Sequence, residues 1–548
     1  MTGTFTKRLR ATRALWANPV VTRDLRVRMR GSKSYWHQGF YLGLLGVLAL
    51  AGYGTAVGWG GEGDPNGMSA VDVQQHLQSF YYFIFFTLAA LITLIAPALT
   101  AVSITTERQR LSLDLLVTTP LTASELLIGK MLSSTAFLAL LLALSLPASA
   151  LCVILGGATL GDVIRVYLLL AVDGLVLAAL GLLVSCATRA SLPALVWTYL
   201  TVAGFLALTA FAYFATLAST YGRSAGTTAS PAASVGALNP FVAVYIGGQS
   251  FDVGNVHVPL WVGAGVVAVL LIRLLVTAAT YRLGSYGGSP IGSLRRQLLL
   301  LSGVGVFGLA YGIFQGALLS SGVSGSQRGI ALEGGLLFVF ALAGLLLPSL
   351  FTPATPSEDD PPGVAVEGWY APLRAFRPEH AGALPFFHLW LVTIVLAAMA
   401  GLWAVGALTM ELWQPALLTA FYLSGVGFLF WALCRRASSW LRGVTAGRAL
   451  GFVLFAVLAW LPLAILMLFS ATSSDLQIKD SPLSWFWIFY PLLRMETTSW
   501  HDGTAITALV WSGALCYGLG LLIYPFWRSV VPGGRAKAEK HNANAVQS

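Results

Sequence analysis

Residues 80–104 read FYYFIFFTLAALITLIAPALTAVSI, a run of 25 residues without a single Asp, Glu, Lys or Arg. About 20 apolar residues, at 1.5 Å each, are enough for a helix to cross the hydrocarbon of a bilayer. Runs of similar length and character recur along the chain, for example at residues 131–156 and 192–219. The sequence is therefore predicted to be all-α, a polytopic bundle of transmembrane helices.

The same length rule predicts about twelve spans. The first six are expected near 38–58, 80–104, 131–156, 163–187, 192–219 and 258–281, and the second six near 298–320, 330–351, 386–410, 414–434, 449–470 and 503–527. The composition agrees, because 57% of the 548 residues are hydrophobic and only 10% are charged. Soluble domains carry roughly 25% charged residues. A soluble enzyme is therefore excluded.

The net charge of +10 is distributed according to the predicted topology. With the N-terminus in the cytoplasm, 26 of the 32 Lys and Arg residues fall on the cytoplasmic side and four fall outside. Cytoplasmic loops of membrane proteins carry such an excess of Lys and Arg. Both termini are therefore predicted to be cytoplasmic, and the basic charge requires no nucleic-acid partner.

The segment before the first span is strongly basic and has a helical pattern. Asn18 and Pro19 are typical of a helix start, and apolar residues then recur every fourth position, at Val21, Leu25 and Met29. Arginines separate these apolar residues. The pattern predicts an amphipathic helix in the cytoplasmic headgroup layer, and a solvated basic tail is the alternative.

The loop after the second span, ITTERQRLSLDLLVTTPLTASELLIGK over residues 104–130, is the most informative polar stretch. Glu107 and Arg110 are spaced i,i+3, and Arg110 and Asp114 are spaced i,i+4, as in helical ion pairs. The loop is expected to begin as a short amphipathic helix. Such a helix could dock on a partner protein or lie on lipid.

A helix break and a new start follow in the same loop. Thr119-Pro120 ends the first helix, because proline cannot continue it. Thr122, with Glu125 three residues later, forms the pattern of a capping box, so a new helix is expected to begin there and run into the third span.

Three motifs resemble ABC-2-type transporter permeases, over roughly residues 15–285. They are Asn18-Pro19 with Arg23-Asp24-Leu25, the loop from Thr106-Glu107-Arg108 to Gly129-Lys130, and Asn239-Pro240-Phe241 before the sixth span. The resemblance implies the membrane subunit of an ABC exporter, a multi-pass protein of the bacterial cytoplasmic membrane. It also implies that the N-terminal helix packs beside the loop, and that the external segment after the fifth span gates the path.

In that family the loop couples the permease to a separate ATP-binding subunit, expected here in two copies. Carried over to this sequence, the coupling residues are Glu107, Arg108, Arg110, Asp114, Thr119 and Pro120. The sequence around Gly129-Lys130 is not a P-loop, because Ser124 and Met131 break the pattern GxxxxGK[ST]. The ATPase is therefore expected on another polypeptide. ATP and magnesium are therefore expected in the partner subunit. No cofactor or metal is expected in this chain.

The predicted domains are a connecting helix at 1–37, a six-span permease domain at 38–285, and six further spans at 286–548. The second half lacks the Glu-Arg and Thr-Pro elements, although Gly447-Arg448 loosely resembles Gly129-Lys130. It is either a diverged second permease half, which would make a pseudo-dimer in one chain, or a set of accessory helices. In the second case the chain would form a homodimer or pair with another permease.

Asp173 and Arg273 are charged residues deep in the fourth and sixth predicted spans. Charges inside a bilayer are costly and are functional candidates. They are expected either to pair or to be placed independently. An ion-coupled secondary transporter would need more intramembrane acids than Asp173, and an intramembrane enzyme would need a nucleophile with its base. Both classes stay as alternatives to the permease.

Overall fold

The computed structural model describes residues 19–29, 32–57, 70–110, 122–220, 233–253, 256–283, 291–318, 383–406, 410–440 and 503–523, together with four residues between 450 and 457. The chain divides into two compact units, Met1–Gly322 and Val323–Ser548. The predicted domains at 1–37, 38–285 and 286–548 remain a prediction. Each compact unit is described by itself.

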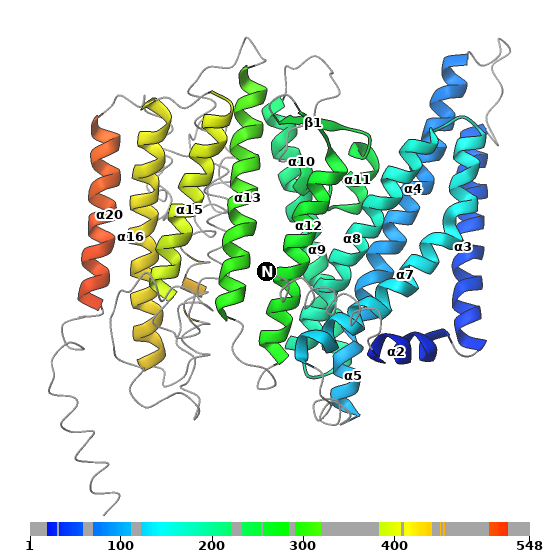
Figure 1. Ribbon diagram of the computed structural model, residues 1–548, viewed down its shortest axis with the longest axis horizontal. Helices are drawn as coiled ribbons and strands as arrows, with labels where there is room; N and C mark the ends of the chain where they lie inside the picture. Colours follow the sequence, from blue (N-terminus) through cyan, green and yellow to red (C-terminus); the bar gives the residue numbers. More distant parts are fainter. Residues whose placement is uncertain are drawn as a thin grey trace, which may run out of the picture. The chain divides into compact units, whose positions relative to one another are not determined.

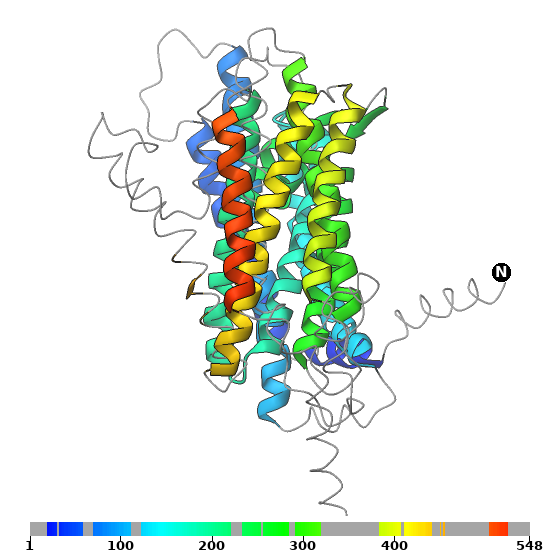
Figure 2. The same cartoon turned by 90° about the vertical axis from the view of Figure 1, so that its left-hand side faces the viewer.

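Long helices make up most of the first unit (Figure 1). The long helices are α3 (Ser32–Val57), α4 (Ala70–Ala101), α7 (Ala123–Ile154), α8 (Leu160–Ala187), α9 (Ser191–Thr220), α12 (Leu260–Leu283) and α13 (Ile291–Leu318), and the shorter ones are α2 (Pro19–Met29) and α5 (Ser103–Gln109). The long helices run side by side, whereas α2 lies across their ends (Figures 1 and 2). The predicted amphipathic helix therefore forms, and it begins at Pro19 as the sequence indicates.

Two sets of contacts mark the two ends of the first unit. At one end, which we call the α2 end, a hydrophobic cluster joins α2, α5, the start of α7 and the last turns of α8 and α12; its buried members are Val20, Ile104, Leu126, Leu127, Leu182, Cys186, Ala279 and Leu283. At the opposite end, Gln74 near the start of α4 donates to the carbonyl of Gly156 after α7. Helices α4, α7 and α8 therefore cross the unit in alternating directions.

α8 is the most enclosed of the candidate spans. It packs against α4, α7, α9 and α12. Gly181 permits the closest approach, because a Cβ there would lie 2.7 Å from the carbonyl oxygen of Pro97 and would also collide with the Thr100 hydroxyl. Thr100 instead donates a 2.8 Å hydrogen bond to the carbonyl of Ala178. This hydroxyl joins two spans inside the bundle.

The end opposite α2, which we call the hairpin end, carries two short helices and two strands. They are α10 (Ala233–Gly236), α11 (Pro240–Ile246), β1 (Ser250–Val253) and β2 (Val256–Pro259). The strands pair antiparallel, with Phe251 opposite Val258. The described residues are mostly helical, and this hairpin is a departure from the all-α prediction. Phe251, Val253, Val256 and Val258 alternate with polar residues on the two sides of Gly254-Asn255, a pattern typical of a hairpin.

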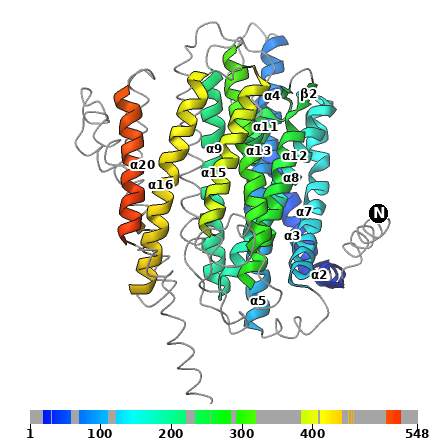
Figure 3. The same cartoon turned by 60° about the vertical axis from the view of Figure 1, so that its left-hand side comes forward.

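The second unit contains α15 (Ala383–Ala404), α16 (Met410–Trp440) and α20 (Gly503–Ile523) among its described residues. α16 packs against both of the others, and Figure 3 shows it between them. The ring of Tyr517 packs on Phe421 and Phe428, with centroids 5.9 and 5.3 Å away. Its hydroxyl also bonds to that of Ser424.

Seven helices among the described residues are long and apolar enough to cross a membrane. They begin at Gln74, Ala123, Leu160, Ser191, Leu260, Leu384 and Leu417. α3, α13 and α20 cover three more of the predicted spans, although α3 and α20 have shorter apolar stretches. The predicted spans at 330–351 and, almost entirely, 449–470 lie outside the described residues. The protein is a multi-pass membrane protein, and the count of twelve remains a prediction.

Candidate functional site

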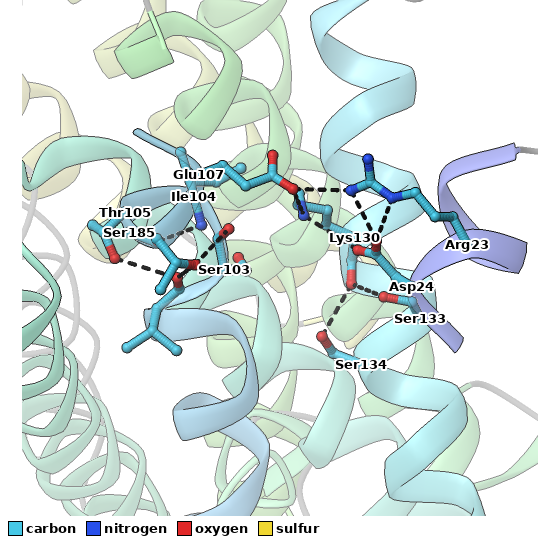
Figure 4. Close-up of polar contacts among 12 residues, drawn as sticks. Arg23, Asp24, Ser103, Ile104, Thr105, Glu107, Lys130, Ser133, Ser134 and Ser185 are labelled. Atoms are coloured by element: carbon cyan, nitrogen blue, oxygen red, sulfur yellow. Dashed lines mark hydrogen bonds and ion pairs between the residues drawn. The ribbon is translucent and has the colours of Figure 1, made fainter. Parts of the chain in front are cut away.

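Four charged side chains meet at the α2 end, and we call them the charged cluster: Arg23 and Asp24 of α2, Glu107 of α5, and Lys130 of α7 (Figure 4). The Lys130 ammonium lies 2.7 Å from Oε1 of Glu107 and 3.2 Å from Oδ2 of Asp24. The Arg23 guanidinium lies 3.0 Å from Oε1 of Glu107 and 3.0 Å from Oδ1 of Asp24. Two cations and two anions thus close a ring between three helices.

The charged cluster is largely withdrawn from solvent. The side chain of Lys130 is 5% exposed, and those of Glu107 and Asp24 are 13% and 15% exposed, whereas that of Arg23 is 51% exposed. Partial burial by itself would lower the pKa of Arg23, but its hydrogen bonds and charge attraction to Asp24 and Glu107 outweigh that effect and raise the pKa. Salt bridges that are this enclosed are strongly coupled, because removing one partner leaves a buried charge.

Local structure positions Lys130. α7 begins with a capping box in which the amide of Glu125 donates to the Thr122 hydroxyl at 3.3 Å and the amide of Thr122 donates to the Glu125 carboxylate at 2.9 Å. This confirms the helix start expected from the sequence. Lys130 follows two turns later, and its carbonyl accepts hydrogen bonds from the hydroxyls of Ser133 and Ser134.

α5 is also tied to the end of α8. The guanidinium of Arg108 donates to the carbonyl of Thr188 at 2.6 Å, and the amide of Ile104 donates to the Ser185 hydroxyl at 3.1 Å. Thr105 and the first residue of α9, Ser191, share a 3.2 Å hydrogen bond between their hydroxyls. α5 therefore contacts four neighbouring elements through polar groups: α2, α7, α8 and α9.

Residues 19–284 match the family model described as ABC-2 family transporter protein. These residues form an ABC-2 transporter domain. Residues 19–284 thus carry the membrane component of an ABC-2 family transporter, a family that implies an ATP-binding partner. No curated protein and no solved structure matches the chain.

The charged cluster unites parts of two of the motifs that suggested this family. Arg23-Asp24 belongs to the first motif, and Glu107 and Lys130 lie at the two ends of the second. No pairing between them was predicted, because Asp24 and Lys130 are 106 positions apart. Two features of the sequence could have indicated the charged cluster: the resemblance itself, and the position of Lys130 inside the otherwise apolar start of a span.

The predicted coupling residues of the ABC-2 domain differ in their surroundings. Glu107 and Arg108 point into the protein, toward the charged cluster and α8, while Arg110 is exposed just after α5. Asp114, Thr119 and Pro120 lie outside the described residues. The expected amphipathic helix is described only as far as Gln109. The coupling role of these residues remains a prediction.

Asp173 and Arg273 of the ABC-2 domain are not brought together. Asp173 is 0% exposed, and neither of its carboxylate oxygens has a hydrogen-bond partner among the described residues. Arg273 is exposed on α12. Of the two alternatives, the one in which Asp173 and Arg273 form an ion pair is wrong, because α8 directs Asp173 into the bundle while α12 directs Arg273 out of it. No group of three or more His, Cys, Asp or Glu that could hold a metal occurs within the described ranges.

Asn239, Pro240 and Phe241, the third motif of the resemblance, begin α11 at the hairpin end of the ABC-2 domain. The Asn239 side chain accepts a 3.1 Å hydrogen bond from the amide of Phe241 and donates one of 3.0 Å to the carbonyl of Leu206. It therefore caps α11 and fastens it to α9. Phe241 stacks on Phe86 of α4, with centroids 6.3 Å apart.

Proposed function

We propose that this protein is the permease of an ABC exporter, and that separate ATP-binding subunits dock at the α2 end and drive it. The observation that carries the proposal is the charged cluster, which connects α5 to α2 and α7 through ion pairs of 2.7 to 3.2 Å. A displacement of α5 would be passed directly to two other helices. ATP and Mg²⁺ would be held by the ATP-binding subunits, and two copies would act on one transporter.

The coupling step is mechanical. α5 follows α4 after a single residue, Val102, and Arg108 and Ile104 fasten it to the end of α8. A subunit that contacts the exposed Gln109 and Arg110 would therefore push on α4 and α8 as well as on α2 and α7. Such rigid-body movement of packed helices is a common way to transmit a conformational change.

The proposal includes an orientation. The α2 end would face the cytoplasm of a bacterial cell, with the hairpin end outside the cytoplasmic membrane, about twelve spans and both termini inside. Seven basic residues lie in or directly next to the helix ends that meet at the α2 end, which agrees with the positive-inside rule; they are Arg23, Arg26, Arg108, Arg110, Lys130, Arg189 and Arg282. A second permease surface would come from residues 286–548, from a second copy or from another permease.

Copurification tests the proposal. We expect the tagged full chain, extracted from its native membrane, to carry a stoichiometric ATP-binding subunit with ATPase activity. Arg110→Glu should remove this subunit, because Arg110 is exposed at the end of α5 and its charge would be reversed. Arg165→Glu is the matched control, since Arg165 is also exposed but lies on the first turns of α8, at the hairpin end.

A chain that purifies without any ATPase would contradict the permease proposal. If the ATP-binding subunit stays bound equally well to both variants, the docking site is not at α5. If Arg165→Glu alone releases it, the proposed orientation is inverted.

A further inference from the structure

Asp173 is a fully buried acidic residue whose carboxyl oxygens have no hydrogen-bond partner among the described residues. It is at the middle of α8, between Leu160 and Ala187, and it is 0% exposed. The five ion pairs of the described residues all lie at the two ends of the unit. No described cation therefore forms an ion pair with Asp173. This side chain would lie near the bilayer midplane.

An ionised carboxylate in this position would be very unfavourable, so Asp173 is the uncharged acid in this conformation. The protonated carboxyl group still has one hydrogen-bond donor and several acceptor sites, and none of them has a partner among the described residues. Buried polar groups in proteins are usually hydrogen-bonded, and an exception requires an explanation. A purely structural role does not supply one, because no described group is held by this carboxyl.

A second buried polar group without a described partner lies on α4 at the same level. It is the Thr93 hydroxyl. The neighbouring residues show this common level. Gly174 follows Asp173 and Ile92 precedes Thr93, and a Cβ on Gly174 would lie 3.5 Å from Cγ2 of Ile92. α4 and α8 pack closely along their length. Thr93 and Asp173 are therefore at a common depth.

A third such group comes from α9. The Thr198 side chain is 0% exposed, and its hydroxyl has no hydrogen-bond partner in the described ranges. The next residue, Tyr199, donates a 2.7 Å hydrogen bond to the carbonyl of Leu94, which follows Thr93. This bond joins α9 to α4 beside Thr93, and Thr198 directly precedes Tyr199 on α9. α9 packs against both α4 and α8.

Asp173 also lies where two hydrophobic clusters of the unit meet. Leu170 and Leu177, one turn away on either side, belong to the cluster that contains the buried residues of α3, α4 and α7, together with Val244 of α11 and Leu275 of α12. Leu169 and Val176 belong to the cluster with α10, α11 and α12. A movement that separates these two clusters would open the bundle at Asp173.

We propose that Asp173, together with the hydroxyls of Thr93 and Thr198, binds a cationic ammonium group of the cargo when the two hydrophobic clusters separate. This inference rests on the proposed permease function. Contact with water lets the carboxylic acid release its proton to water, and the carboxylate then accepts a hydrogen bond from the ammonium. The two hydroxyls supply neutral acceptors at a similar level of the bundle. Anionic cargo is disfavoured, because the acid buried inside the bundle at this depth would become negative, whereas Arg273 is directed out of the bundle.

Labelling with dicyclohexylcarbodiimide tests the site, because this reagent modifies protonated carboxyls in apolar surroundings. The full chain with its copurified partner, in lipid nanodiscs, is labelled and analysed by peptide mass spectrometry. The probe is N,N-dimethyldodecylamine, protonated at pH 7, and 1-dodecanol is its uncharged counterpart. We expect Asp173 to be labelled, protected by the amine and not protected by the alcohol.

Matched variants on α9 make the test specific. Thr198→Val should raise the concentration of amine needed for half-protection by about tenfold, as expected for one lost hydrogen bond to a charged group. Thr201→Val is the control, because Thr201 is exposed and donates only to the carbonyl of Trp197. Asp173→Asn should abolish the label while Asp162, at the hairpin end, stays unlabelled in all proteins.

Absence of labelling at Asp173, equal protection by the alcohol, or equal shifts in the Thr198 and Thr201 variants would overturn the ammonium site. The same preparation distinguishes this failure from failure of the permease proposal. If the ATP-binding partner is present and active but Asp173 is not protected, only the ammonium site is wrong. If no ATPase copurifies, the permease proposal is wrong, whatever the labelling shows.

Discussion

Lys130 compensates two carboxylates from different helices, Glu107 at 2.7 Å and Asp24 at 3.2 Å, and its own side chain is 5% exposed. Arg23 reaches the same two carboxylates from the exposed side. The two cations are not equivalent. Loss of Arg23 leaves Lys130 beside both carboxylates, whereas loss of Lys130 leaves the two enclosed carboxylates with only the half-exposed Arg23 as a partner.

Lys130→Met should destabilise the full chain by about 3 kcal/mol or more, because breaking an enclosed ion pair leaves uncompensated charge. Thermal unfolding in detergent measures the effect. Arg165→Met, which removes an exposed pair with Asp162, should cost less than about 1 kcal/mol.

The cost of Lys130→Met should shrink in a Glu107→Gln background, because one of the stranded charges is then absent. Equal costs in both backgrounds would show that Lys130 stabilises α7 by packing alone. In that case the charged cluster does not hold the three helices together.

At the scale of elements, the contact between α4 and α8 depends on a residue without a side chain. A Cβ at Gly181 would lie 2.7 Å from the carbonyl oxygen of Pro97, which cannot move aside as a flexible side chain can. The approach also lets Thr100 donate to the carbonyl of Ala178. Gly181 therefore sets the distance between two helices that both end beside α5.

Gly181→Val should separate α4 from α8 and destabilise the protein by about 1–3 kcal/mol, as overpacking does. Gly204→Val on α9 is the matched control, because a Cβ there meets no atom within 4 Å. Thermal unfolding of both variants gives the comparison. Equal stability of the two would mean that the packing between α4 and α8 tolerates a wider spacing.

At the scale of the whole molecule, the two ends of the first unit should face opposite sides of the membrane. In a variant without Cys152, Cys186, Cys434 and Cys516, single cysteines at Val256 and Gln109 probe the hairpin end and the α2 end; both positions are exposed. A membrane-impermeant maleimide should label intact cells at Val256→Cys. It should reach Gln109→Cys only after the membrane is permeabilised.

The reverse labelling pattern would invert the proposed orientation and move the ATP-binding subunits to the hairpin end. Labelling of both cysteines in intact cells would contradict a span between them. The experiment is independent of any substrate, because it depends only on which end of the helices each residue occupies.

The sequence alone determined the features that depend on neighbouring residues. Apolar runs of sufficient length predicted the helices α4, α7, α8, α9 and α12, because the energy of crossing a bilayer depends on composition within one segment. The start of α2 at Pro19 and the capping box at Thr122 are likewise local patterns. The family also followed from short motifs, and the match over residues 19–284 confirms it.

Only the tertiary structure decided which charges meet. Helical spacing suggested that Glu107 pairs within its own loop, but α2 and α7 bring Arg23 and Lys130 to it from 84 and 23 positions away. The structure likewise separated Asp173 from Arg273, since each orientation depends on how a whole helix packs. An ion pair forms between atoms that packing brings within 4 Å, and spacing along one segment carries no information about the helices that surround it.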